Sequence, residues 1–270
     1  MTTDKLVPHM EPAQKIRDAV AQVSQLRQDA SGDPALGAAV AQVKRLQSRR
    51  FAGTYADLLG GGPYQAAAQF FLYELYGEAD YSERDAQFSR IAGALQRLFP
   101  QQVMATAVSL AELHALTERL DHAMGHAWLA AAAPAGDARG DAPAAGAPSE
   151  SPAGRYVRAW RTVARRLDRE AQLAVVLEIG RELQRLTRMP GLRLMLKMMR
   201  GPAAAAGMGA LQRFLEAGFD TFAAMARQPG GADGFMALIR ERESELIELL
   251  FEADFVACET QLARTLGQAR

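Results

Sequence analysis

Histidines and carboxylates recur every four residues in one segment of the chain, AELHALTERLDHAMGHAW at residues 111–128. Imidazole and carboxylate groups bind transition metals and transfer protons, and a spacing of four places them along one side of a helix. The segment therefore indicates a metal site or an acid/base site. Its four candidate metal ligands are His114, Glu118, His122 and His126.

Helix geometry limits what these ligands can do together. The four side chains cover about 18 Å along a helix, so one ion can be held only by neighbouring pairs. The apolar stripe of the same helix, which includes Leu116 and Leu120, leaves His122 and His126 on the solvent side. His114 and Asp121 lie at the border of the stripe, with Glu118 a little further out. We expect these three residues to face other helices.

No second helix carries histidine, and the Glu-x-x-His motif of helical di-iron proteins is absent. A metal held by His114 and Glu118, with Glu74 or Glu178 from other helices, is one alternative. A haem or metal bound by His114, or by the His122 and His126 pair, is another. We favour a simpler interpretation, in which His114 makes a structural hydrogen bond at a packed helix edge.

A second group of polar residues lies in an aromatic neighbourhood, FFLYELYG, and just after it. We expect its members to be buried and paired, because an isolated buried charge is costly. Glu74 could act as a general acid or base if burial raised its pKa. We favour an ion pair from Arg84 or Arg90 to Glu74 that fixes the turn after Gly77. The buried polar candidates are Tyr73, Glu74, Arg84 and Asp85.

Charge is segregated along a chain that is neutral overall, with 31 basic and 31 acidic residues. Residues 155–200 carry 12 basic and 4 acidic side chains, whereas residues 201–270 carry 6 and 10. One predicted helix places four arginines in a stripe that could bind an acidic partner or phosphates. An acidic row at Glu241, Glu245, Glu248 and Glu252 could instead neutralise it within the fold, which we favour. The candidate partner surface consists of Arg158, Arg161, Arg165 and Arg169.

Composition and motifs exclude several classes of protein. The single cysteine, Cys258, rules out an intrachain disulfide and fits a reducing cytoplasm. No uninterrupted apolar segment is long enough to span a membrane. The nucleotide-binding and hydrolase motifs G-x-x-x-x-G-K-[ST], G-x-G-x-x-G and G-x-S-x-G are absent.

The apolar periodicity predicts an all-α multi-helix bundle of about 8–11 helices in two halves. Residues 1–130 form the first half, residues 131–153 an Ala/Pro/Gly-rich flexible linker, and residues 154–270 the second half; both halves could share one core. Asp33 and Pro34 should begin one helix, and Ser82 should cap another with help from Asp85. A long helix is expected from Arg155, and a core-facing helix over residues 211–225.

Several segments resemble an uncharacterised bacterial all-α protein family with FFLxxLYG, DxSxRD and LHAL-type motifs. The resemblance implies a helical bacterial protein and no reaction. The matching pieces are Phe70-Phe71-Leu72, Leu75-Tyr76-Gly77, Ser82, Arg84-Asp85, Leu98-Phe99-Pro100, Leu113-His114-Ala115-Leu116, FLEAGFDTFAAM and Arg242-Glu243.

We therefore expect a helical interaction or regulatory protein of the bacterial cytoplasm that is not a catalyst. The methionine-rich segment from Met189 to Met208 suits an adaptable binding groove, although methionine also fills irregular cores. We expect a protein partner, leave open a homo-oligomer, and do not expect nucleic acid or a membrane span. A metal- or haem-binding protein is the first alternative. A protein that binds nucleic acid or an acidic partner through the arginine stripe is the second.

Overall fold

A computed structural model describes residues 11–77, 80–132 and 151–269. Every regular element in these ranges is a helix, which confirms the all-α prediction. None of the described helices is long and apolar enough to cross a lipid bilayer. Most of the predicted linker lies outside the described residues, between the end of one helix at Ala132 and the start of the next at Pro152.

The bounds of the helices are as follows. In chain order they are α1 (Pro12–Gly32), α2 (Pro34–Thr54), α3 (Ala56–Leu59), α4 (Gln65–Phe70), the π-helical segment η1 (Phe71–Leu75), α5 (Ser82–Leu98), α6 (Gln101–Ala132), α7 (Pro152–Val163), α8 (Arg166–Thr187), α9 (Leu192–Met198), α10 (Arg200–Ala205), α11 (Gly209–Met225), α12 (Gly231–Glu252) and α13 (Phe255–Gln268).

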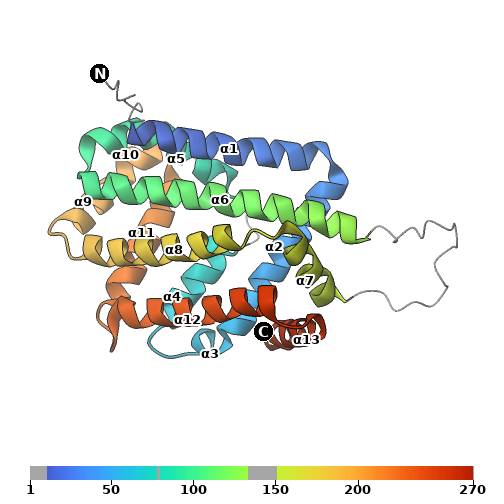
Figure 1. The fold of residues 1–270 in the computed structure, drawn as a ribbon. Helices are drawn as coiled ribbons and strands as arrows, with labels where there is room; N and C mark the ends of the chain where they lie inside the picture. Colours follow the sequence, from blue (N-terminus) through green and yellow to red (C-terminus); the bar gives the residue numbers. More distant parts are fainter. Residues whose placement is uncertain (1–10, 78–79, 133–150, 270) are drawn as a thin grey trace, which may run out of the picture.

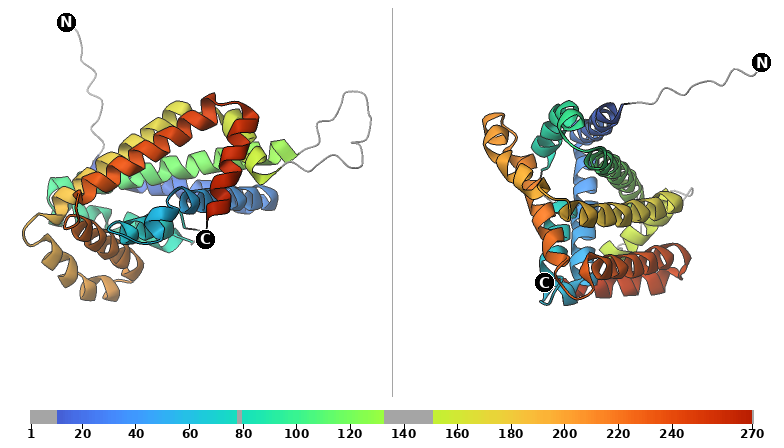
Figure 2. Two further views of the ribbon diagram at one scale, coloured as in Figure 1. Left: turned by 90° about the horizontal axis from the view of Figure 1, so that it is seen from below. Right: turned by 90° about the vertical axis from the view of Figure 1, so that its left-hand side faces the viewer.

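Four long helices, α1, α6, α8 and α12, lie side by side in that order, and α2 and α11 cross behind them (Figure 1). Figure 2 shows the same arrangement from below and from one end. Helix α13 packs on α2 and α7, so segments from the two ends of the chain are neighbours. The molecule is therefore organised by contacts between helices that are distant in sequence.

Hydrophobic clusters join the two halves of the sequence. One cluster contains Val43 and Trp128 from the first half together with Val157 and Leu262 from the second. A second cluster packs Phe51, Phe71, Leu177 and Phe235, among others, and its aromatic rings touch one another; the Phe71 and Phe235 centroids are 5.2 Å apart. Each of these two clusters thus contains side chains from both predicted halves, residues 1–130 and 154–270.

Several helix boundaries follow the predicted signals, and others do not. Asp33 caps α2 by accepting hydrogen bonds from the backbone N–H groups of Ala35 and Leu36, at 3.0 and 3.2 Å. The expected cap at Ser82 is wrong, because Ser82 is already helical and its side chain makes no capping bond. Asp80 instead accepts a hydrogen bond from the Ser82 backbone at 2.9 Å. This leaves the Asp85 carboxylate free to contact other helices.

The long helix expected from Arg155 is also interrupted. Helix α7 ends at Val163, where Ala164 adopts a left-handed conformation with φ of 51°, and α8 starts at Arg166. Neither glycine nor proline marks this break. The break separates the predicted arginine stripe into residues on two helices.

Candidate functional site

The described helices line a partly open cavity of about 600 Å³. Its walls come from both halves of the sequence: α1, α2, α5 and α6 on one side of the predicted linker, and α7, α8, α11 and α12 on the other. Binding pockets for small organic molecules have volumes of roughly 300–1,000 Å³. The cavity is therefore large enough for such a molecule.

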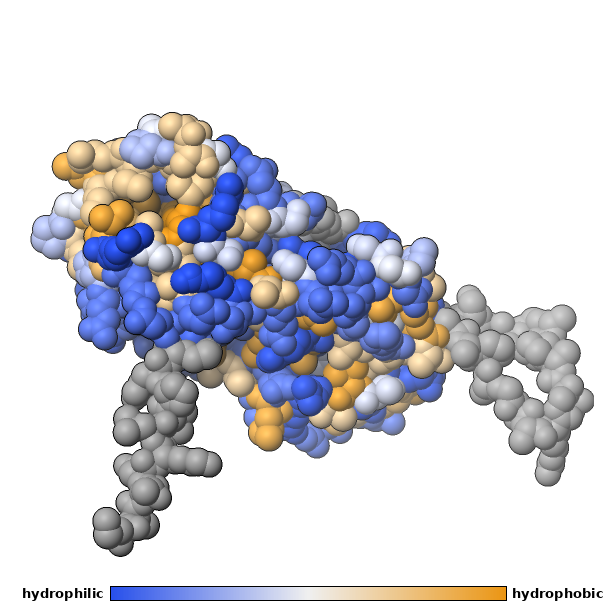
Figure 3. All heavy atoms as spheres, turned by 90° about the horizontal axis from the view of Figure 1, so that it is seen from above, coloured by the Kyte–Doolittle hydropathy of each residue, from blue (hydrophilic) through white to orange (hydrophobic). Residues whose placement is uncertain are grey.

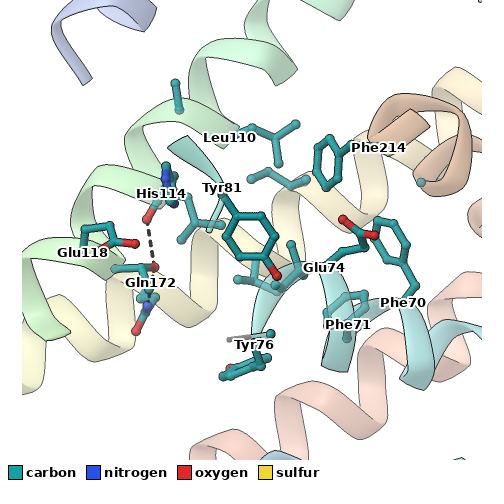
Figure 4. A pocket seen from close by; sticks show the side chains of 18 of the residues that line it. Phe70, Phe71, Glu74, Tyr76, Tyr81, Leu110, His114, Glu118, Gln172 and Phe214 are labelled. Carbon is teal, nitrogen blue, oxygen red and sulfur yellow. Dashed lines mark hydrogen bonds between the residues drawn. The ribbon is translucent and has the colours of Figure 1, made fainter. Parts of the chain in front are cut away.

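The cavity has two chemically different ends. Figure 4 shows His114, Glu118 and Gln172 on one side, and Phe70, Phe71 and Phe214 on the other. The first side, together with Arg169 and Trp160, is called the polar end below. The second is called the aromatic end. This arrangement matches a ligand with an apolar body and a polar group.

A π-helical turn builds part of the aromatic end. At Phe71 the chain changes from the α-helical geometry of α4 to the π-helical geometry of η1. The insertion of one extra residue per turn rotates the following side chains and is frequent at functional sites. Phe71 and Glu74 of this turn line the cavity, whereas Tyr73 is 65% exposed. The prediction that Tyr73 is buried is therefore wrong.

Glu74 makes the predicted ion pair with Arg84. The two side chains are 3.4 Å apart, and the Arg84 guanidinium lies over the rings of Tyr81 and Phe214, at 4.1 and 4.3 Å from their centroids. A cation held between two aromatic faces is stabilised by the ring quadrupoles. The pairing of Arg84 with Glu74 was the favoured interpretation. Arg84 also contacts Phe214 of α11.

His114 belongs to a charge network at the polar end. Its Nε2 atom lies 2.9 Å from Asp85 Oδ2, which also forms an ion pair with Arg27 Nη2 at 2.9 Å. Burial would raise the pKa of Asp85, but the hydrogen bond with His114 and the charges of Arg27 and Arg84 hold it below its usual value. The structural hydrogen bond predicted for His114 is therefore present, with Asp85 as its partner.

Glu118 and Asp121 are both buried, on the face of α6 that meets α2. Lys44 Nζ contacts both carboxylate oxygens of Glu118 at 2.7 and 2.8 Å. Asp121 accepts one hydrogen bond, from Gln47 at 3.0 Å. Burial raises the pKa of Asp121 despite the nearby charges of Lys44 and Arg169.

Asp121→Asn is expected to stabilise the protein at neutral pH. Because the pKa of Asp121 is raised in the folded state, its carboxyl group contributes stability in full below the unfolded-state pKa. This stability is lost as the pH rises through the folded-state pKa. Asparagine keeps the shape of the neutral acid, and Gln47 remains as a partner. Thermal unfolding from pH 4 to 8 should show a variant advantage that grows with pH. A variant less stable than the wild type at pH 8 would contradict this expectation.

The other two histidines of segment 111–128 lie away from the cavity. The His122 and His126 rings are 4.8 Å apart, and His126 is exposed. His122 is half-buried, and burial and the neighbouring His126 lower its pKa. Among the residues that the structure describes, no group of three or more His, Cys, Asp or Glu side chains could hold a metal ion.

The four arginines of the predicted partner surface do not form one row. Arg158 and Arg165 are exposed, Arg161 donates hydrogen bonds to the Leu250 and Ala253 carbonyls, and Arg169 is buried. The break after Val163 is the cause, because it directs Arg169 toward the cavity. Of the acidic row, Glu252 pairs with Arg166, which is not one of the four predicted arginines.

Arg27, Lys44 and Gln172 were also missed as site residues. Each lies on a helix whose sequence has an ordinary amphipathic pattern, and no local motif marks these residues. They join the site through long-range packing of α1, α2 and α8 on α6.

The chain belongs to the family described as domain of unknown function DUF8198, whose model matches residues 25–256. The expected membership of a family with no assigned activity is thereby confirmed. No curated protein and no solved structure matches the chain.

Proposed function

We propose that this protein is a regulatory module that binds a small amphipathic molecule between its two halves. The cavity of about 600 Å³, with a polar end and an aromatic end, is the observation that carries the proposal. Concave sites with mostly apolar walls and a few convergent polar groups are typical of ligand pockets. The protein acts by binding, in the bacterial cytoplasm, as its composition and single cysteine suggest.

The family resemblance supports this location of the site. Residues of its separate motifs, among them Phe70, Tyr76, Arg84, His114 and Glu243, line the cavity although they are far apart in sequence. A ligand in this cavity would therefore contact side chains from several of these motifs.

Helix α9 connects the cavity to the surface. Leu192 and Leu196 line the cavity, whereas Leu194 and Met198 on the same helix are 63% and 70% exposed. Figure 3 shows apolar side chains gathered at the left-hand end of the molecule, where Figure 1 places α9 and α10. A ligand that shifts α9 would change this surface, so a protein partner could respond to cavity occupancy.

A neutral fluorescent probe tests the proposed binding site. N-phenyl-1-naphthylamine should bind saturably and with increased emission, because it can occupy the aromatic end. Leu110→Trp should weaken binding at least tenfold, since Leu110 lies beside Phe214 and a larger side chain there fills the space. Fluorescence titration measures both affinities.

Leu167→Trp is the matched control, because Leu167 is 79% exposed and lies outside the cavity. It should bind the probe as the wild type does. Absence of saturable binding to the wild type, or equal affinities for Leu110→Trp and the wild type, would overturn the proposal.

A further inference from the structure

The polar end of the cavity contains a buried arginine without a counterion. Arg169 is 7% exposed, and no carboxylate of the described residues reaches its guanidinium within 4.0 Å. Its Nη1 donates a long hydrogen bond to Gln172 at 3.4 Å, and its Nη2 has no acceptor. Arginine stays charged in proteins, and an unpaired buried charge costs several kcal/mol. The described residues therefore provide no counterion for Arg169.

A second unpaired donor lies directly beside it. The Arg169 guanidinium lies 4.2 Å from the centroid of the Trp160 ring, and Trp160 Nε1 is buried without an acceptor. Both residues line the cavity. Buried donors without partners are rare in proteins, and each requires an explanation. Two such donors in contact point to one acceptor that both would share.

The chain does not supply that acceptor. The carboxylate of Glu118 is held by Lys44, and that of Asp85 by Arg27 and His114. Asp121 is close enough to interact electrostatically with Arg169, but its hydrogen bond goes to Gln47 and burial favours its neutral form. The other charges of the polar end are thus already neutralised.

We propose that the ligand of this cavity is an organic anion whose carboxylate or phosphate binds Arg169 and Trp160 at the polar end while its apolar body contacts the aromatic end. The planar guanidinium donates parallel hydrogen bonds to two oxygens of such a group, and the indole N–H donates a further one. Phe70, Phe71 and Phe214 surround the apolar body. This inference rests on the proposed function and names the chemical class of its ligand.

Two probes with the same skeleton test the charge preference. 1-Anilinonaphthalene-8-sulfonate is N-phenyl-1-naphthylamine with an added anionic group, so the ratio of their dissociation constants isolates the anion. At constant ionic strength, the wild type should bind the sulfonate at least tenfold more tightly. Decanoate and decyl phosphate should displace it, and the stronger of the two identifies the natural anionic group. Decanol should displace it more weakly than either.

Arg169→Met should reduce the sulfonate affinity at least tenfold and leave that of the neutral probe unchanged. The melting temperature without ligand should stay the same or rise, because the variant removes an uncompensated buried charge. Arg165→Met is the control, since Arg165 lies four residues earlier, is exposed and pairs with Asp168. It should retain the wild-type affinities for both probes.

Trp160→Phe provides a second variant if Arg169→Met does not fold. It keeps an aromatic ring beside Arg169 and removes the indole N–H. It should lower the affinity for the sulfonate and leave the affinity for the neutral probe unchanged. Equal affinities of the two probes for the wild type would overturn the anion proposal while the cavity still binds ligands. If Arg169→Met folds and binds the sulfonate as tightly as the wild type does, the anion proposal is also overturned. If Arg169→Met does not fold, unchanged sulfonate affinity of Trp160→Phe overturns it. Failure of both probes to bind would instead contradict the proposed function itself.

Discussion

Glu243→Leu is expected to lower the free energy of unfolding by about 3–5 kcal/mol. Arg50 is 6% exposed and donates to Glu243 Oε1 at 2.5 Å, and the Tyr55 hydroxyl donates to the same oxygen at 3.0 Å. Leucine removes the carboxylate and leaves the Arg50 guanidinium buried without its counterion. The tyrosine hydroxyl loses its acceptor at the same time. The melting temperature should fall by roughly 6–20 °C.

Glu241→Leu is the matched control, because Glu241 is exposed and lies two residues earlier on α12. Its effect should stay within about 0.5 kcal/mol. The double variant Arg50→Met/Glu243→Leu should recover most of the lost stability, since both charges are then absent. Urea unfolding measures all three variants. If Glu243→Leu is as stable as Glu241→Leu, the Arg50–Glu243 pair does not stabilise the fold.

Gly53→Ala is expected to destabilise the protein by about 3 kcal/mol or more, beyond the usual cost of overpacking. A Cβ atom at this position would lie 1.9 Å from the backbone oxygen of Thr265, so α13 would have to move away from α2. That movement would also pull Leu262 and Cys258 out of their shared cluster. Thermal unfolding measures the loss.

Gly93→Ala is the corresponding control within a helix. A Cβ atom at Gly93 meets nothing within 4 Å, so the substitution should stabilise the protein by about 0.5–1 kcal/mol through helix propensity. Equal stabilities of the two variants would contradict the close approach of α2 and α13.

Local sequence signals predicted much of the fold. Asp33 and Pro34 mark a helix start because their effects act within one turn, and the structure places them as expected. The apolar spacing of residues 211–225 gave the correct buried face, with Leu211, Phe219 and Phe222 in the interior. Both signals depend on neighbouring residues alone.

Features that depend on tertiary packing were not predictable in the same way. The left-handed Ala164 lacks a local signal, and its effect is to move Arg169 from a supposed surface stripe to the cavity wall. The π-helical turn at Phe71 has no sequence signature either. His114 and Asp85 were each recognised as candidates, but their hydrogen bond depends on how α5 meets α6. The set of residues that meet at the polar end could therefore not be predicted from the sequence.

The packing of α2 against α13 also has a consequence for synthesis of the chain. The hydrogen bond from Arg49 to the Leu266 carbonyl spans 217 residues, and ribosomes add roughly 5–20 residues per second. About 10–40 s therefore pass between the emergence of α2 and that of its partner helix. During this time Val43 and Leu46 lack part of their final cover. The nascent chain must therefore tolerate an exposed apolar helix face until α13 emerges.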